Sequence, residues 1–301
     1  MFKHMLVPLD GSSLAESALP VAALLAEKTG AKVTLLHVVE KAAPPEVHGQ
    51  PHLRSAEEAN RYLNQVSQKW FPKGGAVDCH VHTGETSDVA ASIDGHRGEL
   101  AHDLIVMCTH GRGRALHLIL GSMAQKIIAM GPIPVLITHP EEKGENQSFS
   151  CGSILVPLDT DSDHARAVPV AKELARACGA TLHLATVVPH FTTLSGPMVA
   201  PSRFLPGTTS RMLELQVQSA EEYLQAQRDA LQRQGVAAAF HVLRGQPAEV
   251  IVDFAGQMSA AFIVLATHGR SGMDAFWEGS VAHRICSRST IPLLLIPVGK
   301  R

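Results

Sequence analysis

The stretch Thr109-His110-Gly111, nine further residues and then Gly121-Ser122 decides the fold of this chain, because of what flanks it. The run Asp103–Met107 before it predicts a buried parallel strand, and residues 123–130 after it predict a helix. Two glycines ten positions apart let backbone N–H groups approach a ligand, and the amino end of the following helix attracts anions. The sequence therefore predicts a phosphate-binding loop at the carboxyl end of a strand.

The same device occurs a second time. Thr267-His268-Gly269, nine residues and Gly279-Ser280 follow another apolar run, and the strand end Val-Pro-Leu-Asp10 recurs as Val-Pro-Leu-Asp159. A repeat whose period is a whole domain indicates duplication rather than a solenoid. We expect two homologous domains over residues 1–140 and 151–301, joined by a polar linker over residues 141–150.

Composition narrows the classes of partner. With 301 residues, 45% of them hydrophobic, the chain has material for two cores, and a net charge of -2 gives no electrostatic reason to bind nucleic acid or a membrane surface. No charged leader or bilayer-spanning apolar run precedes the first strand, so we expect a cytoplasmic protein. The five cysteines form no Cys-x-x-Cys pair and are expected to be reduced thiols.

Histidines are numerous, and one pair raises the question of a metal site. His80 and His82 lie two apart on one face of a predicted strand, whereas His48 and His52 fall in a proline-rich loop. A metal needs a third ligand that the sequence does not place. We therefore expect no metal site.

Strands and helices alternate along the first half. The pattern predicts strands over 3–9, 32–39, 77–83, 103–107 and 134–138, with helices over 14–29, 53–70, from about 88 to 96, and 123–130. Such alternation favours an α/β fold with a doubly wound parallel sheet covered by helices on both faces. Ligands bind such sheets where the strand order reverses; a switch between the first and fourth strands would place Asp10 opposite the Gly111 loop.

These elements resemble the universal stress proteins in their tandem form. The resemblance rests on the two Val-Pro-Leu-Asp strand ends, on residues 35–39 and 182–188, on Gly245-Gln-Pro-Ala-Glu-Val-Ile251, and on the two His-Gly-x9-Gly-Ser loops. It implies two Rossmann-like, five-stranded parallel sheets of strand order 3-2-1-4-5, the adenine nucleotide alpha hydrolase-like fold. It also implies a pseudo-dimer of the two halves through their fifth strands, burying residues 133–137 against residues 293–296, with further homodimerisation left open.

The resemblance further implies a site for ATP or another adenine nucleotide in each half, with or without Mg²⁺. The family motif Gly-x-x-Gly-x9-Gly-Ser/Thr is matched except at its first glycine, which is Cys108 in one half and Ala266 in the other. The implied contacts are Pro8, Leu9, Asp10, Val38, Met107, Cys108, Gly111, Arg112, Gly121, Ser122 and Met123 in the first half, and Pro157, Leu158, Asp159, Val187, Leu265, Ala266, Gly269, Arg270, Gly279, Ser280 and Val281 in the second.

Other interpretations of these residues stay open. Asp10 and Asp159 also suit helix caps, and His110 and His268 suit structural positions in a turn better than catalytic bases. The leading hypothesis is a stress-response module that binds nucleotide, works with protein partners still to be identified, and is not an enzyme. The alternatives are a nucleotide-independent adaptor or scaffold and a slow ATP hydrolase, for which neither half offers an acidic pair to hold Mg²⁺ together with a separate base.

Overall fold

The computed structural model describes residues 1–41, 43–72, 75–86, 88–109, 121–140, 149–159, 164–194, 199–268 and 280–298. Contacts divide the chain into two compact units, one of residues 1–150 with the last strand, the other beginning at residue 151. Most of the predicted linker and both predicted phosphate loops, residues 110–120 and 269–279, lie outside the described residues.

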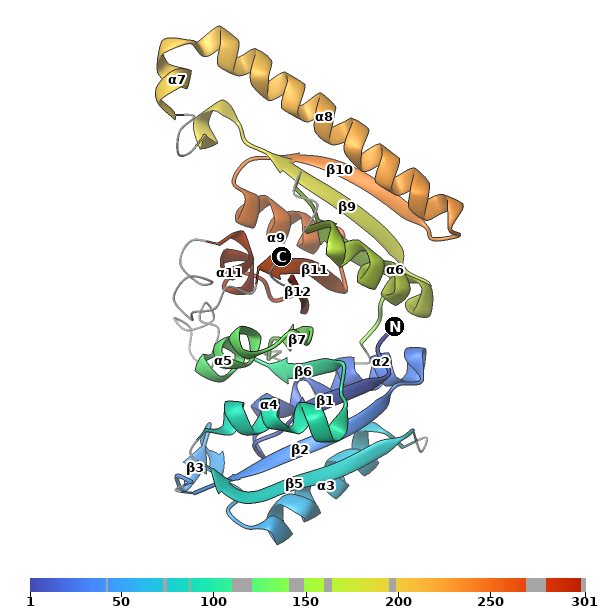
Figure 1. Ribbon diagram of the computed structural model, residues 1–301, viewed down its shortest axis with the longest axis vertical. Helices are drawn as coiled ribbons and strands as arrows, with labels where there is room; N and C mark the ends of the chain where they lie inside the picture. The colour runs from blue at the N-terminus through green and yellow to red at the C-terminus, as the bar shows by residue number, and fades with distance from the viewer. Residues whose placement is uncertain are drawn as a thin grey trace. The chain divides into compact units, whose positions relative to one another are not determined.

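The first unit alternates strands and helices (Figure 1). Its strands are β1 (His4–Pro8), β2 (Lys32–Glu40), the short β3 (Glu46–Val47) and β4 (Gln50–Pro51), β5 (Val77–Thr86), β6 (Leu104–Cys108), β7 (Val135–Thr138) and β12 (Leu293–Val298). Its described helices are α1 (Ser13–Glu16), α2 (Leu19–Thr29), α3 (Ala56–Trp70), α4 (Val89–Leu100) and α5 (Ser122–Met130).

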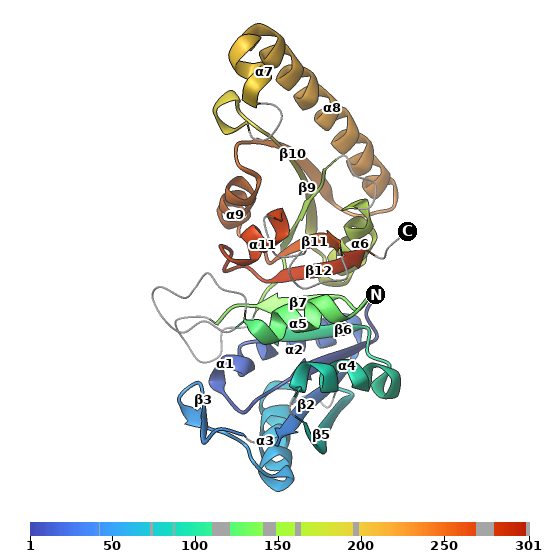
Figure 2. The ribbon, with the colours of Figure 1, turned by 60° about the vertical axis from the view of Figure 1, so that its left-hand side comes forward.

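The sheet of this unit has the predicted order. Strands run β5-β2-β1-β6-β7, all parallel, which is the order 3-2-1-4-5. Met5, Leu6 and Val7 at the centre of β1 are 0% exposed, as expected for a parallel strand covered on both faces. Helix α2 packs with α3, and α4 packs with α5 on the other face of the sheet (Figure 2).

Strand β12 pairs antiparallel with β7. Leu293, Leu294 and Leu295 stand opposite Ile137, Leu136 and Val135, and all six are buried. Residues 135–137 and 293–295 of the two apolar runs are thus buried against each other within the first unit. The pairing covers an edge that would otherwise present unpaired backbone groups and apolar side chains.

Two local predictions were wrong. The expected helix over 14–29 is broken into α1 and α2, because Pro20 near the start of α2 has no N–H to donate to the carbonyl of Glu16 and its ring would collide with that turn. The predicted end at residue 29 is confirmed, because α2 ends at Thr29 and Gly30 follows in the left-handed conformation. The strand expected over residues 77–83 is also longer than predicted, since β5 continues through Thr86.

The second unit repeats the pattern. Its strands are β8 (Ser153–Pro157), β9 (Thr181–Val188), β10 (Ala238–Arg244) and β11 (Phe262–His268), and its described helices are η1 (His164–Arg166), α6 (Ala167–Cys178), η2 (Phe191–Thr193), α7 (Val199–Phe204), α8 (Pro206–Arg233), α9 (Pro247–Gln257) and α11 (Val281–Cys286). The order is β10-β9-β8-β11, all parallel, the first four positions of 3-2-1-4-5.

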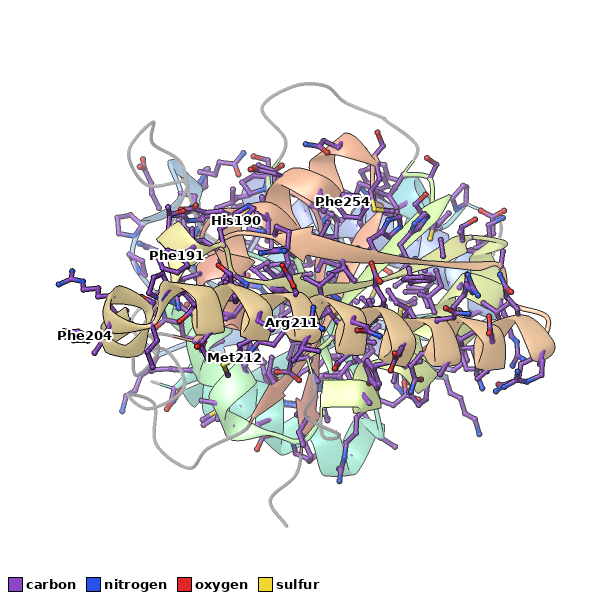
Figure 3. The ribbon with its side chains drawn as sticks, turned by 90° about the horizontal axis from the view of Figure 1, so that it is seen from above. His190, Phe191, Phe204, Arg211, Met212 and Phe254 are labelled. Atoms are coloured by element: carbon purple, nitrogen blue, oxygen red, sulfur yellow. The ribbon has the colours of Figure 1, made fainter. Side chains whose placement is uncertain are left out.

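The described part of the segment over residues 189–209, which follows β9, is largely helical. It contains η2, α7 and the first turn of α8, the long helix that packs along β10 and β9. Leu213 and Ala220 of α8 are buried with Val188, whereas Phe204 is 83% exposed and projects away from the end of α7 (Figure 3). These helices therefore form a layer over the edge of the sheet at β10.

Candidate functional site

The turn after β1 is formed by Asp10. Its Oδ1 accepts hydrogen bonds from the Ser12 backbone N–H and hydroxyl at 2.8 and 2.6 Å. The Ser12 hydroxyl accepts from the Ala15 N–H at 3.1 Å and is the cap of α1. Asp10 therefore shapes the turn but is not itself the cap, and its other oxygen, Oδ2, is not used in these bonds.

Gly11 explains why this turn is tight. Its φ is +90°, and a Cβ built on it would lie 2.9 Å from Cγ of Leu53, the residue that leads into α3. An L-residue resists that φ, and the leucine occupies the space a side chain would need. The glycine thus brings the Asp10 turn against the chain that follows β4.

The end of β2 is tied to the same turn. Leu9 N–H donates to the Leu36 carbonyl at 2.8 Å, and His37 Nδ1 lies 2.8 Å from the Leu9 carbonyl, to which it donates. Burial lowers the pKa of His37, so the imidazole is neutral at pH 7. In the second unit Thr186 has the corresponding role, donating to the Leu158 carbonyl at 2.9 Å.

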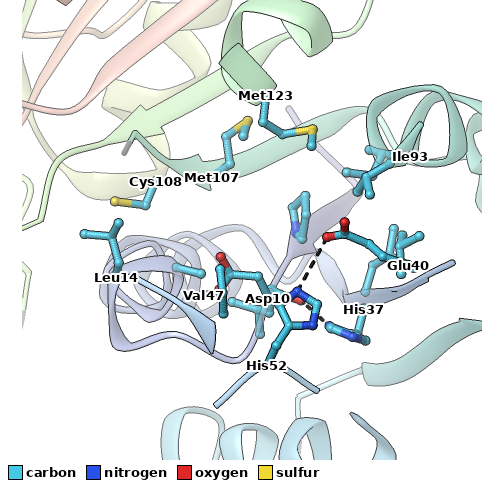
Figure 4. Close-up of a pocket in the computed structure, with 16 residues that line it drawn as sticks. Asp10, Leu14, His37, Glu40, Val47, His52, Ile93, Met107, Cys108 and Met123 are labelled. Atoms are coloured by element: carbon cyan, nitrogen blue, oxygen red, sulfur yellow. Dashed lines mark hydrogen bonds and ion pairs between the residues drawn. The ribbon is translucent and has the colours of Figure 1, made fainter. Parts of the chain in front are cut away.

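A pocket opens beside these strand ends, with about 790 Å³ of empty space, part of it open to solvent (Figure 4). It lies at the carboxyl ends of β1, β2 and β6, and the strand order reverses between β1 and β6. This is where open α/β sheets bind ligands. Its lining residues are Pro8, Leu9, Asp10, Leu14, Ala15, Leu36, His37, Val38, Glu40, Val47, His52, Val89, Ile93, Met107, Cys108 and Met123.

Most predicted residues of the first half meet here. The pocket brings together Pro8, Leu9, Asp10, Val38, Met107, Cys108 and Met123. Gly121 and Ser122 begin α5, directly before Met123, while Gly111 and Arg112 lie outside the described residues. The apolar walls from α1 and α4, with His37, Glu40, Val47 and His52, were not predicted.

Cys108 forms one wall of the pocket at the place of the family's first glycine. It is 6% exposed, and burial raises the pKa of its thiol to about 12. The side chain is therefore a neutral, inert group at pH 7. Its presence narrows the pocket relative to a glycine.

Helix α5 presents an amino end without a side-chain cap. Gly121 is its N-cap residue, with φ -58° and ψ 147°, and as a glycine it has no side chain that could accept a hydrogen bond from the first turn of α5. Any residue can adopt these backbone angles. A requirement for glycine at this position would therefore come from the lack of room for a side chain and not from φ. The uncapped N–H groups beside Met123 suit an anion.

The second-half residues occupy equivalent places. Pro157 ends β8 and is followed by Leu158 and Asp159, Val187 lies in β9, Leu265 and Ala266 lie in β11, and Ser280 and Val281 begin α11. The Ser280 hydroxyl caps α11 by accepting from the His283 N–H at 3.1 Å. Gly269, Arg270 and Gly279 lie outside the described residues.

The two tyrosines of the chain also correspond. Tyr62 in α3 donates to Glu16 Oε1 at 3.2 Å, and its pKa is raised by burial first and by the charges of Glu16 and Asp10. Tyr223 in α8 has a pKa raised by burial and by the charge of Asp159. Each unit thus places a neutral phenol near the aspartate that follows its first strand.

A hairpin covers part of the pocket and was missed by the sequence analysis. Strands β3 and β4 pair antiparallel around His48 and Gly49, whose φ values are +51° and +72°. Positive φ at both turn residues is the geometry of a two-residue hairpin loop. The sequence feature that could have indicated the hairpin is a glycine-containing turn in the loop that follows β2. This loop lies at the carboxyl end of the strand, the edge of the sheet where ligands bind.

His80 and His82 have a third histidine beside them. Nε2 of His80 and of His96 in α4 are 3.1 Å apart, and the rings of His80 and His82 each lie 4.9 Å from that of His96, edge to face. His96 Nδ1 donates to the Ser92 carbonyl at 2.6 Å. Within the described ranges no group of three or more His, Cys, Asp or Glu residues is arranged to hold a metal ion.

No helix in the described part of the chain combines the length and the apolarity that crossing a membrane requires.

The fold and the pocket define the class of protein: α/β proteins with an open parallel sheet and a cavity where the strand order reverses. Comparison with known proteins identifies the family. The model of the universal stress protein family matches residues 1–139 and again residues 152–297. The chain therefore belongs to the universal stress protein family and carries its domain twice.

Individual relatives agree with this assignment. A universal stress protein of Mycolicibacterium smegmatis is 24% identical over 306 residues, covering 97% of this chain and 96% of the relative. A universal stress protein of Thermus aquaticus is 34% identical over 145 residues, 46% of this chain and all of the relative. A solved universal stress protein from Archaeoglobus fulgidus has a TM-score of 0.66 at 18% identity, covering 99% of this chain and 97% of that one, and shows the shared fold.

Proposed function

We propose that this chain is a stress-response module that binds an adenine nucleotide such as ATP in the pocket of its first unit. The observation that carries the proposal is the meeting of seven predicted contact residues in one cavity at the switch point. Pro8 and Leu9 line the pocket from the end of β1, Val38 from β2, and Met107 and Met123 from β6 and α5. The apolar walls suit a planar base, and the uncapped start of α5 suits phosphate.

The proposed activity is binding without turnover. The two acidic residues of the pocket, Asp10 and Glu40, lie near His48 and His52 at 3.7 and 3.5 Å. That arrangement places an imidazole beside each carboxylate, and in the described part of the chain no three His, Cys, Asp or Glu side chains are grouped to hold a metal ion such as Mg²⁺. ATP incubated with the purified protein should therefore be recovered without release of inorganic phosphate.

Calorimetric titration with ATP and mass spectrometry of small molecules released on denaturation test the proposal. Asp10→Asn keeps an oxygen for the Ser12 bonds but removes the charge, and we expect ATP affinity in the first unit to fall at least about tenfold. Asp103→Asn is the matched control, because Asp103 accepts from the Lys3 and His4 N–H groups where β1 begins. Equal effects of the two substitutions, or no bound nucleotide at all, would refute the proposal.

One observation favours a second function, a nucleotide-independent adaptor. Asp10 has its Oδ1 bonded to Ser12 and its Oδ2 near His48, so this pocket carboxylate has partners within the chain. An adaptor would keep these contacts permanently. Partner capture that ignores added ATP and survives Asp10→Asn would select this function.

A further inference from the structure

Exposed apolar side chains gather where α7 meets α8. Eight large hydrophobic side chains are exposed in the described part of the chain, and four of them lie between residues 204 and 215. They are Phe204, Leu205, Met212 and Leu215, which are 83%, 57%, 43% and 47% exposed (Figure 3 shows the first and third). Single apolar residues are ordinary on a surface, whereas a cluster indicates a contact site.

The first unit offers an internal comparison, because α3 is the counterpart of α8. Tyr223 stands 161 positions after Tyr62, and β10 begins 161 positions after β5. At this offset α3 corresponds to residues 217–231, so residues 206–216 of α8 have no helical counterpart in the first unit. The exposed residues of α3 are all polar. The fold of the domain therefore does not require the exposed apolar residues, which lie before or within these added turns of α8.

One face of α8 is exposed over about four turns. The residues three, four and seven positions on either side of Leu215 are all exposed: Thr208, Arg211, Met212, Gln218, Ser219 and Glu222. These spacings place them with Leu215 on one side of the helix, here named the outer face. Leu213, Ala220 and Leu224 lie on the opposite side and are buried. The outer face is thus a continuous surface with an apolar centre.

The outer face is self-complementary about Leu215. Its two charged residues have opposite signs, with Arg211 four positions before Leu215 and Glu222 seven positions after it. When two α8 helices lie antiparallel with Leu215 against Leu215, Arg211 of each copy comes within about 5 Å, along the helix axis, of Glu222 of the other. A parallel pair would instead place like charges together. A two-fold interface needs this kind of self-matching patch.

We propose that the outer face of α8 is a homodimer interface, in which two copies of the chain pack α8 against α8 in antiparallel orientation about Leu215. Leu215 and Met212 then lose exposed apolar surface, and the small Ser219 leaves room for Met212 of the other copy. Within the helix, Arg211 pairs with Glu214 at 2.9 Å, and both side chains are more than 60% exposed. So exposed a pair contributes little to stability, and its rearrangement does not oppose dimerisation.

Sedimentation velocity on the full-length protein, from about 1 to 200 µM, tests the interface, because a helix pair of this length predicts a micromolar Kd. Leu215→Arg should stay monomeric throughout, since it places two guanidinium groups at the centre of the pair. Met130→Arg is the matched control: Met130 is 41% exposed at the end of α5, and this variant should dimerise like the wild type. A monomeric wild type, or a dimer that Leu215→Arg leaves intact, would overturn the proposal.

Charge reversal tests the antiparallel orientation. Arg211→Glu and Glu222→Arg should each weaken dimerisation roughly three- to tenfold, because each sets like charges against one another twice in the dimer. The double variant should return to within about twofold of the wild type. The two residues are eleven positions apart, about 16 Å along one helix, so recovery has to come from contact between copies. Losses that add up in the double variant would overturn the antiparallel pairing.

Discussion

The replacement of Gly11 by alanine tests the tightest contact of the site. At φ +90° an L-residue costs about 1–2 kcal/mol, and a Cβ 2.9 Å from Leu53 Cγ adds a steric term of about 1–2 kcal/mol because the half-buried leucine must move. We expect Gly11→Ala to lower the free energy of unfolding of the first unit by about 2–4 kcal/mol. Hydrogen exchange of the β1 and β2 amides, followed as a function of urea concentration, measures this loss of free energy of unfolding in the first unit alone.

Gly30→Ala is the matched control for this prediction. Gly30 has φ +67° with nothing within 4 Å of a built Cβ, so alanine there carries the backbone cost without the collision. The excess of Gly11→Ala over Gly30→Ala should be about 1–2 kcal/mol and should vanish in a Leu53→Ala background. Equal costs for the two alanines, or an excess that survives Leu53→Ala, would refute the steric reasoning.

Three further outcomes follow from individual residues. Burial lowers the pKa of His139 to about 4, from 6.5 in the unfolded chain, so its contribution to stability is complete above pH 6.5 and is lost as pH falls to 4. This loss amounts to about 3 kcal/mol. In urea denaturation, the free energy of unfolding of His139→Gln should therefore fall less between pH 6.5 and pH 4 than that of the wild type. Ser55→Ala removes the hydroxyl that accepts from the Glu58 N–H in the capping box of α3 and should cost about 1 kcal/mol by the same measurement; no change would argue against the box. The Cys108 thiol, with a pKa of about 12, should resist a disulfide reagent at pH 8 until denaturant is added, as peptide mapping would show; rapid labelling of the native protein would contradict its burial.

Short-range chemistry and repetition were enough to predict most of the fold. Apolar runs of four or five residues marked β1, β6 and β8, Gly30 marked the end of α2, and the recurrence of Val-Pro-Leu-Asp marked the duplication. These features act over a few residues, or repeat as a unit, and a linear pattern records them. The family resemblance implied that Val38 and Cys108 join Asp10 in one site, and the three line one cavity because the carboxyl ends of parallel strands meet at one edge of a sheet.

Contacts between distant segments were decided only by the tertiary structure. Nothing local indicates that His48 lies at Asp10 and His52 at Glu40, or that His96 joins His80, since each pairing depends on how a loop or helix packs on the sheet. The sequence by itself determined the repeat, the alternation of strands and helices, and the polar groups available to a site, while the strand order came from the family resemblance. The tertiary structure decided which of those groups face one another, because side-chain proximity across the sheet depends on packing angles and turn geometry that no spacing along the chain records.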